Sequence, residues 1–536
     1  MGQESIKNLK ARIKKAESLK DDRRSLNESA YEMAMPQRNL YNSSNVGDSR
    51  MSGLFTSTGM SSANNFVNNM QNSLTPPFTR WAELEAGDSV PEESVNELNI
   101  ALEKLTKQFF TFLDASNFST SAPEMYYDLM VGTGALLINK GDHEKPLNFQ
   151  AIPTAQLALE EGIFGSIGGV FRKHSVPVRL IEQQWKDAKI PAKLAIMIKD
   201  KPTDKVMLDE ITYYDPKSAN WYYEVLWLES GEKGDEERIV QRVTKYNPWI
   251  IVRWSKIAGE VEGRGPLLQA LPDLKMHNHG KEMAAVTAQM NAFGTYTAEE
   301  DGILDTRTAQ IAPGGMLIVK NNPGGPNAPS IAALPRVGDT GAQDFFFQGL
   351  EDSIKKIMMD NKLPPESGAV RSPTEIVERI REFQADFGAA FGRLMHEFVA
   401  PLFKTTLIVL DELALVTVPT VEVVNPLTGA KEKKKITETI AFTKIKMLSP
   451  VAKAQQMEDV QNVIQAIQIS QGIEPRLALA GFKIEDLPRW LGDKLGVPSE
   501  LLREKAEMPA AIQAYLKLIG AEQGAGQAPP PSSPMQ

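Results

Sequence analysis

The chain has 536 residues, of which 42% are hydrophobic and 24% are charged, a globular balance that excludes wholesale disorder. It contains no cysteine, which excludes disulfides, cysteine-ligated zinc and thiol nucleophiles. Its 59 basic and 68 acidic residues give a net charge of −9, whereas proteins that grip nucleic acid are usually basic. At roughly 150 residues per domain, the length predicts several domains.

Neither a targeting segment nor a membrane span is expected. The N-terminal stretch MGQESIKNLKARIKK is polar and lacks the apolar core of a signal peptide. The most apolar segment, residues 402–416, is interrupted by Lys404, Asp411 and Glu412, so it does not supply the ~18 apolar residues of a span.

Apolar residues at helical spacing predict that the first part of the chain is helical. Pro36 should end the first helix, and the residues that follow it are rich in Ser, Asn and Gly, which indicates an irregular connection. The predicted helices cover residues 1–36, 61–73, 92–114 and 122–131.

Beyond residue 134 the pattern changes to short runs rich in Val, Ile, Trp and Tyr, which are typical of strands. A helix is predicted among them at 179–189, so this part should be mixed α and β. The predicted strands cover residues 135–139, 147–152, 168–174, 206–214, 221–228 and 249–254.

From residue 265 helical spacing returns. Helices are predicted at 265–293 and 341–360, with a strand-and-turn region between them that contains the apolar run 316–319. Further along, a hairpin is predicted from 416–424 and 436–445, and then helices over 451–520.

The clearest helix signal begins at Ser372. Ser372 is an N-cap residue, Pro373 occupies the first helical position, and Glu375 completes a capping box. The apolar face that follows runs on to Leu402, and Pro401 should kink or split this long helix.

No catalytic constellation is visible. There is no G-x-x-x-x-G-K-[ST] phosphate loop, and Gly132-Thr133-Gly134 lacks the third glycine of a dinucleotide fingerprint. His277 and His279 are two residues apart in a predicted helix and should face different ways, which disfavours a shared metal. We therefore expect no enzyme activity, no cofactor and no metal, and a structural or assembly role.

Several segments resemble the portal proteins, or head-to-tail connectors, of short-tailed bacteriophages. The resemblance covers most of residues 20–460, and Gly263-Arg264-Gly265-Pro266 followed by Ala270-Leu271-Pro272-Asp273 is its most specific part. The other matching segments are 54–59 (LFTSTG), 74–81 (LTPPFTRW), 126–129 (YYDL) with 132–135 (GTGA), and 313–315 (PGG).

The resemblance implies an α+β, portal-type fold assembled as a dodecameric ring with a central channel. It assigns the N-terminal helices and a mixed α/β wing to 1–262, and a small α/β clip to 294–340 between the stem helices at 263–293 and 341–361. The remaining parts would be a tunnel loop at 362–373, the long kinked helix and a wing hairpin at 374–450, a helical crown at 451–520 and a disordered tail at 521–536.

A portal would occupy one capsid vertex, where double-stranded DNA is packaged, retained and ejected and where the tail attaches. The implied partners are the terminase large subunit, the major capsid and scaffolding proteins, a tail adaptor protein and the DNA genome, bound without sequence specificity. The protein would be assembled in the bacterial cytoplasm and reside in the virion. A net acidic wall would let DNA slide past without being gripped.

The candidate DNA-facing residues are Lys362 and Arg371, which bracket the stretch KLPPESGAVR of the implied tunnel loop. Their phosphate contacts would be weak and blind to sequence. The alternative is that both residues cap neighbouring helices or pair with Glu366 and Glu375. For the protein as a whole, the alternatives are another phage structural protein, such as a minor capsid or tail component, and a phage nuclease.

Overall fold

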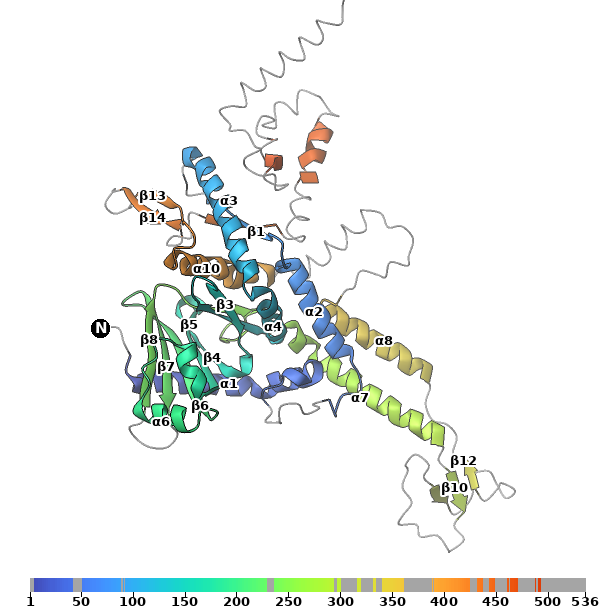
Figure 1. The fold of residues 1–536 in the computed structure, drawn as a ribbon. Helices are drawn as coiled ribbons and strands as arrows, with labels where there is room; N and C mark the ends of the chain where they lie inside the picture. Colours follow the sequence, from blue (N-terminus) through green and yellow to red (C-terminus); the bar gives the residue numbers. More distant parts are fainter. Residues whose placement is uncertain are drawn as a thin grey trace, which may run out of the picture.

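The computed structural model describes residues 4–41, 51–87, 90, 92–228, 236–293, 296–299, 316–319, 331–333, 340–360, 388, 390–424, 431–436, 443–448, 460–461, 463–470, 487 and 490–492. They form a mixed helix-and-sheet protein, in agreement with the predicted α+β class. Figure 1 shows a body of packed helices and sheets from which one pair of long helices projects.

The helices predicted in the first part of the chain are confirmed. Ser5 caps the first of them by accepting a hydrogen bond from the backbone N–H of Asn8 at 3.3 Å, and this helix ends before Pro36 as expected. The helices are α1 (Ile6–Ala34), α2 (Thr58–Leu74), α3 (Glu92–Ala115) and α4 (Phe118–Val131).

The larger sheet is antiparallel throughout and is covered on both faces. α1 packs Leu9 and Ile13 against one face, whereas Trp185 and Leu194 pack against the other. Its strands lie in the order β4 (Leu157–Glu161), β5 (Ile167–Pro177), β6 (Lys205–Asp215), β7 (Asn220–Leu228) and β8 (Glu236–Thr244).

The helix predicted at 179–189 is wrong in its extent. The chain makes a 3-10 turn, η4 (Val178–Leu180), that runs into the single turn α5 (Ile181–Gln184), and a second helix, α6 (Ala192–Asp200), follows Pro191. The break occurs where Trp185 turns into the core and its indole N–H donates to the Tyr223 hydroxyl at 2.9 Å. Tertiary packing therefore overrides the local helical preference here.

A smaller three-stranded sheet lies at the centre of the body. Its middle strand is β2 (Thr133–Lys140), flanked by β3 (Leu147–Ala151) and β9 (Trp249–Arg253), and both pairings are antiparallel. One face of β2 and β9 packs into the main core with α4 and α10 (Ala400–Glu412), and the other packs against the larger sheet.

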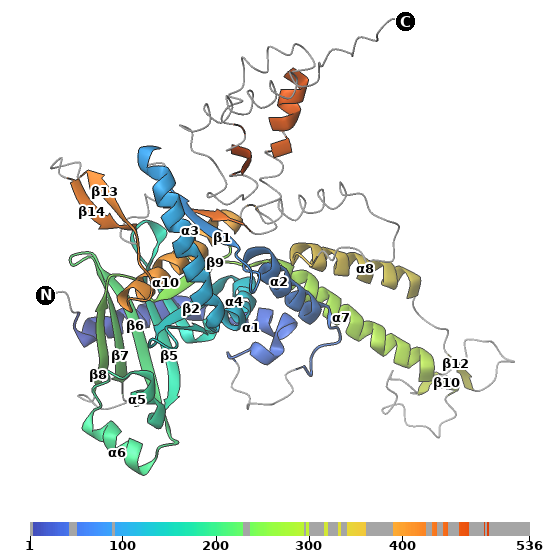
Figure 2. The ribbon, with the colours of Figure 1, turned by 45° about the horizontal axis from the view of Figure 1, so that its top comes forward.

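The projecting pair consists of α7 (Pro266–Phe293) and α8 (Thr340–Ile357), at the positions predicted for both helices. Three short strands lie between them in the sequence, and Figure 2 shows this region at the far end of the pair. They are β10 (Tyr296–Glu299), β11 (Met316–Val319) and β12 (Ile331–Ala333), in the order β11-β10-β12.

Pro401 does not split the long helix. Residues 390–412 stay helical through a π-helical turn at Met395–Val399 and continue as α10 (Ala400–Glu412). Proline cannot donate the backbone N–H that a regular helical turn requires. The wider π turn ends at Val399, two residues before Pro401. The start of the predicted helix, including Ser372, lies outside the described residues.

The predicted hairpin has a different second strand. β13 (Thr420–Val424) pairs with β14 (Lys431–Lys435) instead of with residues 436–445. β15 (Thr443–Met447) instead pairs with β1 (Ala82–Ala86), which the sequence did not predict, and the side chain of Met447 is buried there. The lysine-rich stretch carries no apolar alternation, so its strand could not be recognised from periodicity.

The predicted C-terminal helices are only partly described. Residues 460–461 and 463–470 are helical, and most of 451–520 lies outside the described residues. Among the helices that the structure describes, none combines the length and the apolar character of a membrane span.

Candidate functional site: the junction at the root of the projecting helices

The two glycine motifs singled out in the sequence meet in space at the start of α7. A Cβ atom on Gly132 would overlap the carbonyl oxygen of Gly263, and one on Gly263 would overlap that of Gly132. A Cβ atom on Gly265 would overlap the carbonyl oxygen of Met130. Glycine is therefore required at all three positions because backbones touch.

Backbone hydrogen bonds hold this contact together. The N–H of Gly265 donates to the carbonyl of Val131 at 2.9 Å, and the N–H of Trp254 donates to that of Gly132 at 2.9 Å. The Thr133 hydroxyl accepts from the N–H of Gly263 at 2.8 Å. The end of α4, the beginning of β2 and the entry to α7 are thus fixed to one another, and we call this region the junction.

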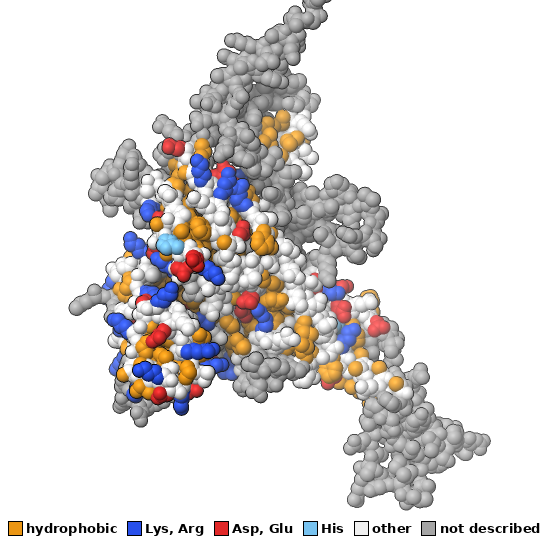
Figure 3. Space-filling model, viewed as in Figure 1, with side chains coloured by type: hydrophobic (Ala, Val, Ile, Leu, Met, Phe, Trp, Pro, Cys, Tyr) orange, Lys and Arg blue, Asp and Glu red, His pale blue; other side chains and the backbone are white. Residues whose placement is uncertain are grey.

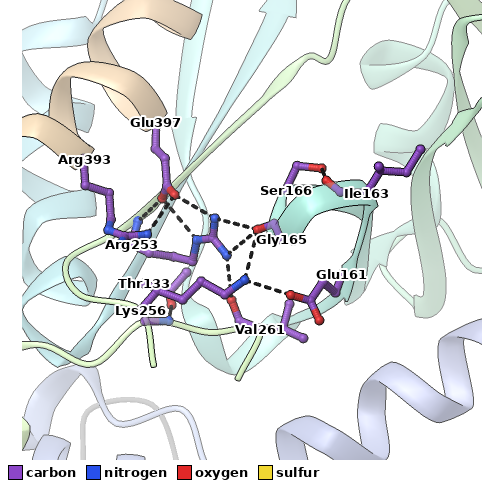
Figure 4. Close-up of polar contacts among 11 residues, drawn as sticks. Thr133, Glu161, Ile163, Gly165, Ser166, Arg253, Lys256, Val261, Arg393 and Glu397 are labelled. Atoms are coloured by element: carbon purple, nitrogen blue, oxygen red, sulfur yellow. Dashed lines mark hydrogen bonds and ion pairs between the residues drawn. The ribbon is translucent and has the colours of Figure 1, made fainter. Parts of the chain in front are cut away.

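Arg253, at the end of β9, is the charged centre of the junction and is only 4% exposed. Figure 4 shows its guanidinium between the Glu397 carboxylate and the carbonyl of Gly165. It donates to Glu397 at 2.7 and 3.1 Å, to Gly165 O at 3.2 Å and to Val261 O at 3.2 Å. Such a bidentate and fully hydrogen-bonded arrangement is the form in which a buried arginine is tolerated.

Glu397 reaches Arg253 from the π-helical turn. Its carboxylate also accepts the backbone N–H of Arg253 at 2.9 Å and lies 3.4 Å from the Arg393 guanidinium. π-helical turns inside α-helices often occur at functional sites, where they redirect a side chain. The helix at residues 390–412 is thereby connected to the central sheet through the Arg253–Glu397 ion pair.

The third component is the turn η3 (Ile163–Gly165), which joins β4 to β5. Lys256 donates to Gly165 O at 3.2 Å and to the Glu161 carboxylate at 2.8 Å. This ammonium group lowers the pKa of Glu161 below its usual value. The Gly165 carbonyl therefore accepts hydrogen bonds from two cationic side chains, Arg253 and Lys256.

The projecting helices leave the junction as an antiparallel pair. Ser353 Oγ donates to Asp273 Oδ2 at 2.7 Å. The Phe347 ring packs so closely on Gly280 that a Cβ atom at position 280 would overlap it. His277 is fully buried between the helices, 3.3 Å from Glu351, and burial lowers its pKa. These contacts hold the two helices side by side near the body.

The charged groups of the junction are paired with one another. Its cations face carboxylates and carbonyls, and among the described residues no three His, Asp or Glu side chains gather closely enough to hold a metal ion. His277 is buried whereas His279 is exposed and lies 3.3 Å from Glu282, so the two histidines face apart as the sequence predicted.

The family model described as bacteriophage head to tail connecting protein matches residues 6–502. The chain belongs to this family. As a member, it is a structural component of the phage particle, in the head-to-tail assembly that has capsid and tail partners. A search of curated proteins gave no match. The match spans the junction and both projecting helices, so the resemblance noted for the glycine motifs extends over nearly the whole chain.

The sequence and the structure differ on which residues stand out. Lys362 and Arg371, the predicted DNA-facing pair, lie outside the described residues. Arg253 and Glu397 were not singled out from the sequence. Their one signal was a lone charge within an apolar run: Arg253 ends WIIVR, and Glu397 stands beside Phe398 and Val399.

Proposed function

We propose that this connector is a portal protein, which forms a ring-shaped channel at one capsid vertex for the packaging, retention and ejection of double-stranded DNA and for attachment of the tail. The supporting observation is the projecting helix pair, which is fixed rigidly at its root but leaves apolar side chains exposed along its length. Met276, Met283, Phe345 and Phe346 are all exposed in the isolated chain.

Apolar side chains on a projecting pair need a partner surface. Large exposed apolar areas are uncommon in monomeric proteins and indicate interaction sites. Figure 3 shows hydrophobic side chains reaching the surface along the pair. If copies stood side by side around an axis, each pair would cover its neighbour, and a heterologous contact of this kind closes into a ring.

The parts of the portal would be those that the resemblance implies. α7 and α8 would be the stem, within 263–293 and 341–361, and the residues between them, 294–340, would be the clip. Residues 1–262 would be the N-terminal helices and the mixed α/β wing, and residues 374–450 would be the long helix and the wing hairpin. Residues 362–373 would be the tunnel loop, 451–520 the crown and 521–536 the tail.

The channel would pass DNA without gripping it. A chain with a net charge of −9 gives a ring whose overall field repels phosphate. Lys362 and Arg371 would add two cations per copy on the tunnel loop, and their weak contacts would slow backward movement of DNA. The other partners would be the terminase large subunit, the major capsid and scaffolding proteins, and a tail adaptor.

The test is particle imaging of the purified full chain by negative-stain electron microscopy, together with native mass. We expect closed rings, dodecameric as in the family, with a bore wide enough for duplex DNA. Monomers alone at micromolar concentration would contradict the proposal.

The role of the tunnel loop is tested separately with the double variant Lys362→Ala, Arg371→Ala. Rings and procapsids should form normally, whereas packaging yield or retention of packaged DNA should fall. Unchanged packaging and retention would remove these two residues from the mechanism.

A further inference from the structure

The turn η3 presents apolar side chains to solvent on a rigid base. Phe164 is fully exposed and Ile163 is 58% exposed. The Lys256 ammonium group holds the Gly165 carbonyl at the end of the turn. We call Ile163 and Phe164 the apolar tip.

Phe164 combines two unfavourable features. Its φ of 56° lies in the left-handed region, which is unfavourable for a non-glycine residue, and its aromatic ring is exposed to water. Glycine would avoid both costs at this position. Phe78 shares both features, but at Phe164 they coincide with a second exposed apolar side chain, Ile163, in the same turn. It is this combination that indicates a contact outside the isolated chain.

The turn is held in this conformation by many contacts. The N–H of Gly162 donates to Ser166 O at 2.7 Å, and Ser166 Oγ donates to Ile163 O at 2.7 Å. Arg253 and Lys256 fix the Gly165 carbonyl from the other side, as Figure 4 shows. A contact residue that is held in place before binding loses little conformational freedom when a partner arrives.

The charges around the tip are paired within the chain. Glu161 binds Lys256 at 2.8 Å, and Glu160 accepts from Arg12 Nε at 3.1 Å. A charged partner such as DNA would therefore find no unpaired cation among these four side chains. Two copies of a chain with a net charge of −9 repel each other. The repulsion between them is smallest where an apolar contact is surrounded by charges that are already paired.

We propose that the apolar tip is a contact point between adjacent copies of this chain, with Phe164 inserted into the surface of the neighbouring copy. This inference rests on the proposed ring and names one of its contacts. The tip would be connected inside each copy, through Gly165 and Arg253, to Glu397 and to the root of the projecting helices.

The first experiment compares Phe164→Gly with Phe78→Gly in the full chain. Phe78 is a matched control because it also has a φ of 56° and is 76% exposed. Glycine relieves the backbone at both positions, so neither variant should melt below wild type. We expect Phe164→Gly to raise the concentration needed for assembly at least tenfold, as for an aromatic hot spot, and Phe78→Gly to leave it unchanged.

The second experiment uses the absence of cysteine in the chain. Ile163→Cys supplies a single thiol and keeps Phe164. Its reaction with a maleimide should be at least tenfold slower in assembled particles than in the same protein diluted to monomers. Equal rates in the two states would overturn the inference.

The outcomes separate the two proposals. Wild-type rings together with undiminished assembly of Phe164→Gly, or an equal loss in both glycine variants, would overturn the role of the tip and leave the portal function standing. A wild-type chain that forms no rings would overturn both.

Discussion

The junction and the outer part of the projecting helices are built on opposite principles. At the junction, backbones touch through glycines, and Arg253 is almost fully buried with its donors paired. Along the outer half of α7, Met283 and Val286 are exposed. The body therefore carries its own stability, whereas the projection has apolar surface that only a partner can cover.

The largest effect is expected where the junction loses a charge. Glu397→Ala leaves Arg253 buried without its carboxylate, which should lower the free energy of unfolding by about 3–5 kcal/mol. The control is Lys355→Ala on α8, because Lys355 and Glu351 form an exposed pair at 3.7 Å of a kind that contributes about 0–1 kcal/mol. Chemical denaturation measures both, and equal losses would contradict the contrast between the two regions.

Backbone contact at the junction is probed by adding one methyl group. Gly265→Ala would force the entry of α7 away from Met130, and we expect a loss of about 3 kcal/mol, the upper end for overpacking. In α8, Gly349→Ala meets nothing within 4 Å and should stabilise the helix by about 0.5–1 kcal/mol. Thermal melting of the two variants should move in opposite directions, and a harmless Gly265→Ala would show that the junction can relax.

Acid should stabilise the body through Asp128. Burial raises the pKa of this carboxyl to about 6, although the hydroxyl of Tyr31 donates to it. The folded state then keeps a proton that the unfolded chain releases, so unfolding free energy falls as pH rises from about 4 to about 6, by up to about 3 kcal/mol. In Asp128→Asn this fall should shrink, and Asp209, whose pKa burial also raises to about 6, should account for part of what remains. Chemical denaturation of both proteins at a series of pH values measures the unfolding free energy. If Asp128→Asn shows the same pH dependence as the wild type, Asp128 is excluded as its source.

The helix pair should respond to acid in the opposite sense, and more weakly. Burial lowers the pKa of His277. The neighbouring Glu351 carboxylate acts in the opposite direction, whereas the cations of Lys281 and Lys355 lower the pKa further. A lowered pKa means that stability is lost as pH falls below the ordinary histidine value of about 6.5. The protection factors of the α8 amides, which are exchange rates corrected for the intrinsic effect of pH, should therefore be lower at pH 5.5 than at pH 7.5, and His277→Gln should reduce that difference. Protection factors that are the same at both pH values would rule the histidine out.

The sequence by itself determined the N-terminal helices, most strands of the mixed region and the two long helices, because their burial follows local periodicity. Pro36 marked the end of α1 in the sequence alone. The glycine motifs at 132–134 and 263–265 also stood out, since a backbone that must come close to another admits no other residue.

Only the tertiary structure decided how these parts meet. β1 and β15 are far apart in the chain, and their pairing depends on where the body folds rather than on either strand. The helix predicted at 179–189 ends early because the Trp185 side chain is buried and donates a hydrogen bond to Tyr223. Arg253 and Glu397 are separated by 144 residues, and a salt bridge between distant residues leaves no periodic trace in sequence. The junction is therefore a property of three-dimensional packing, whereas the elements that it joins were already determined locally.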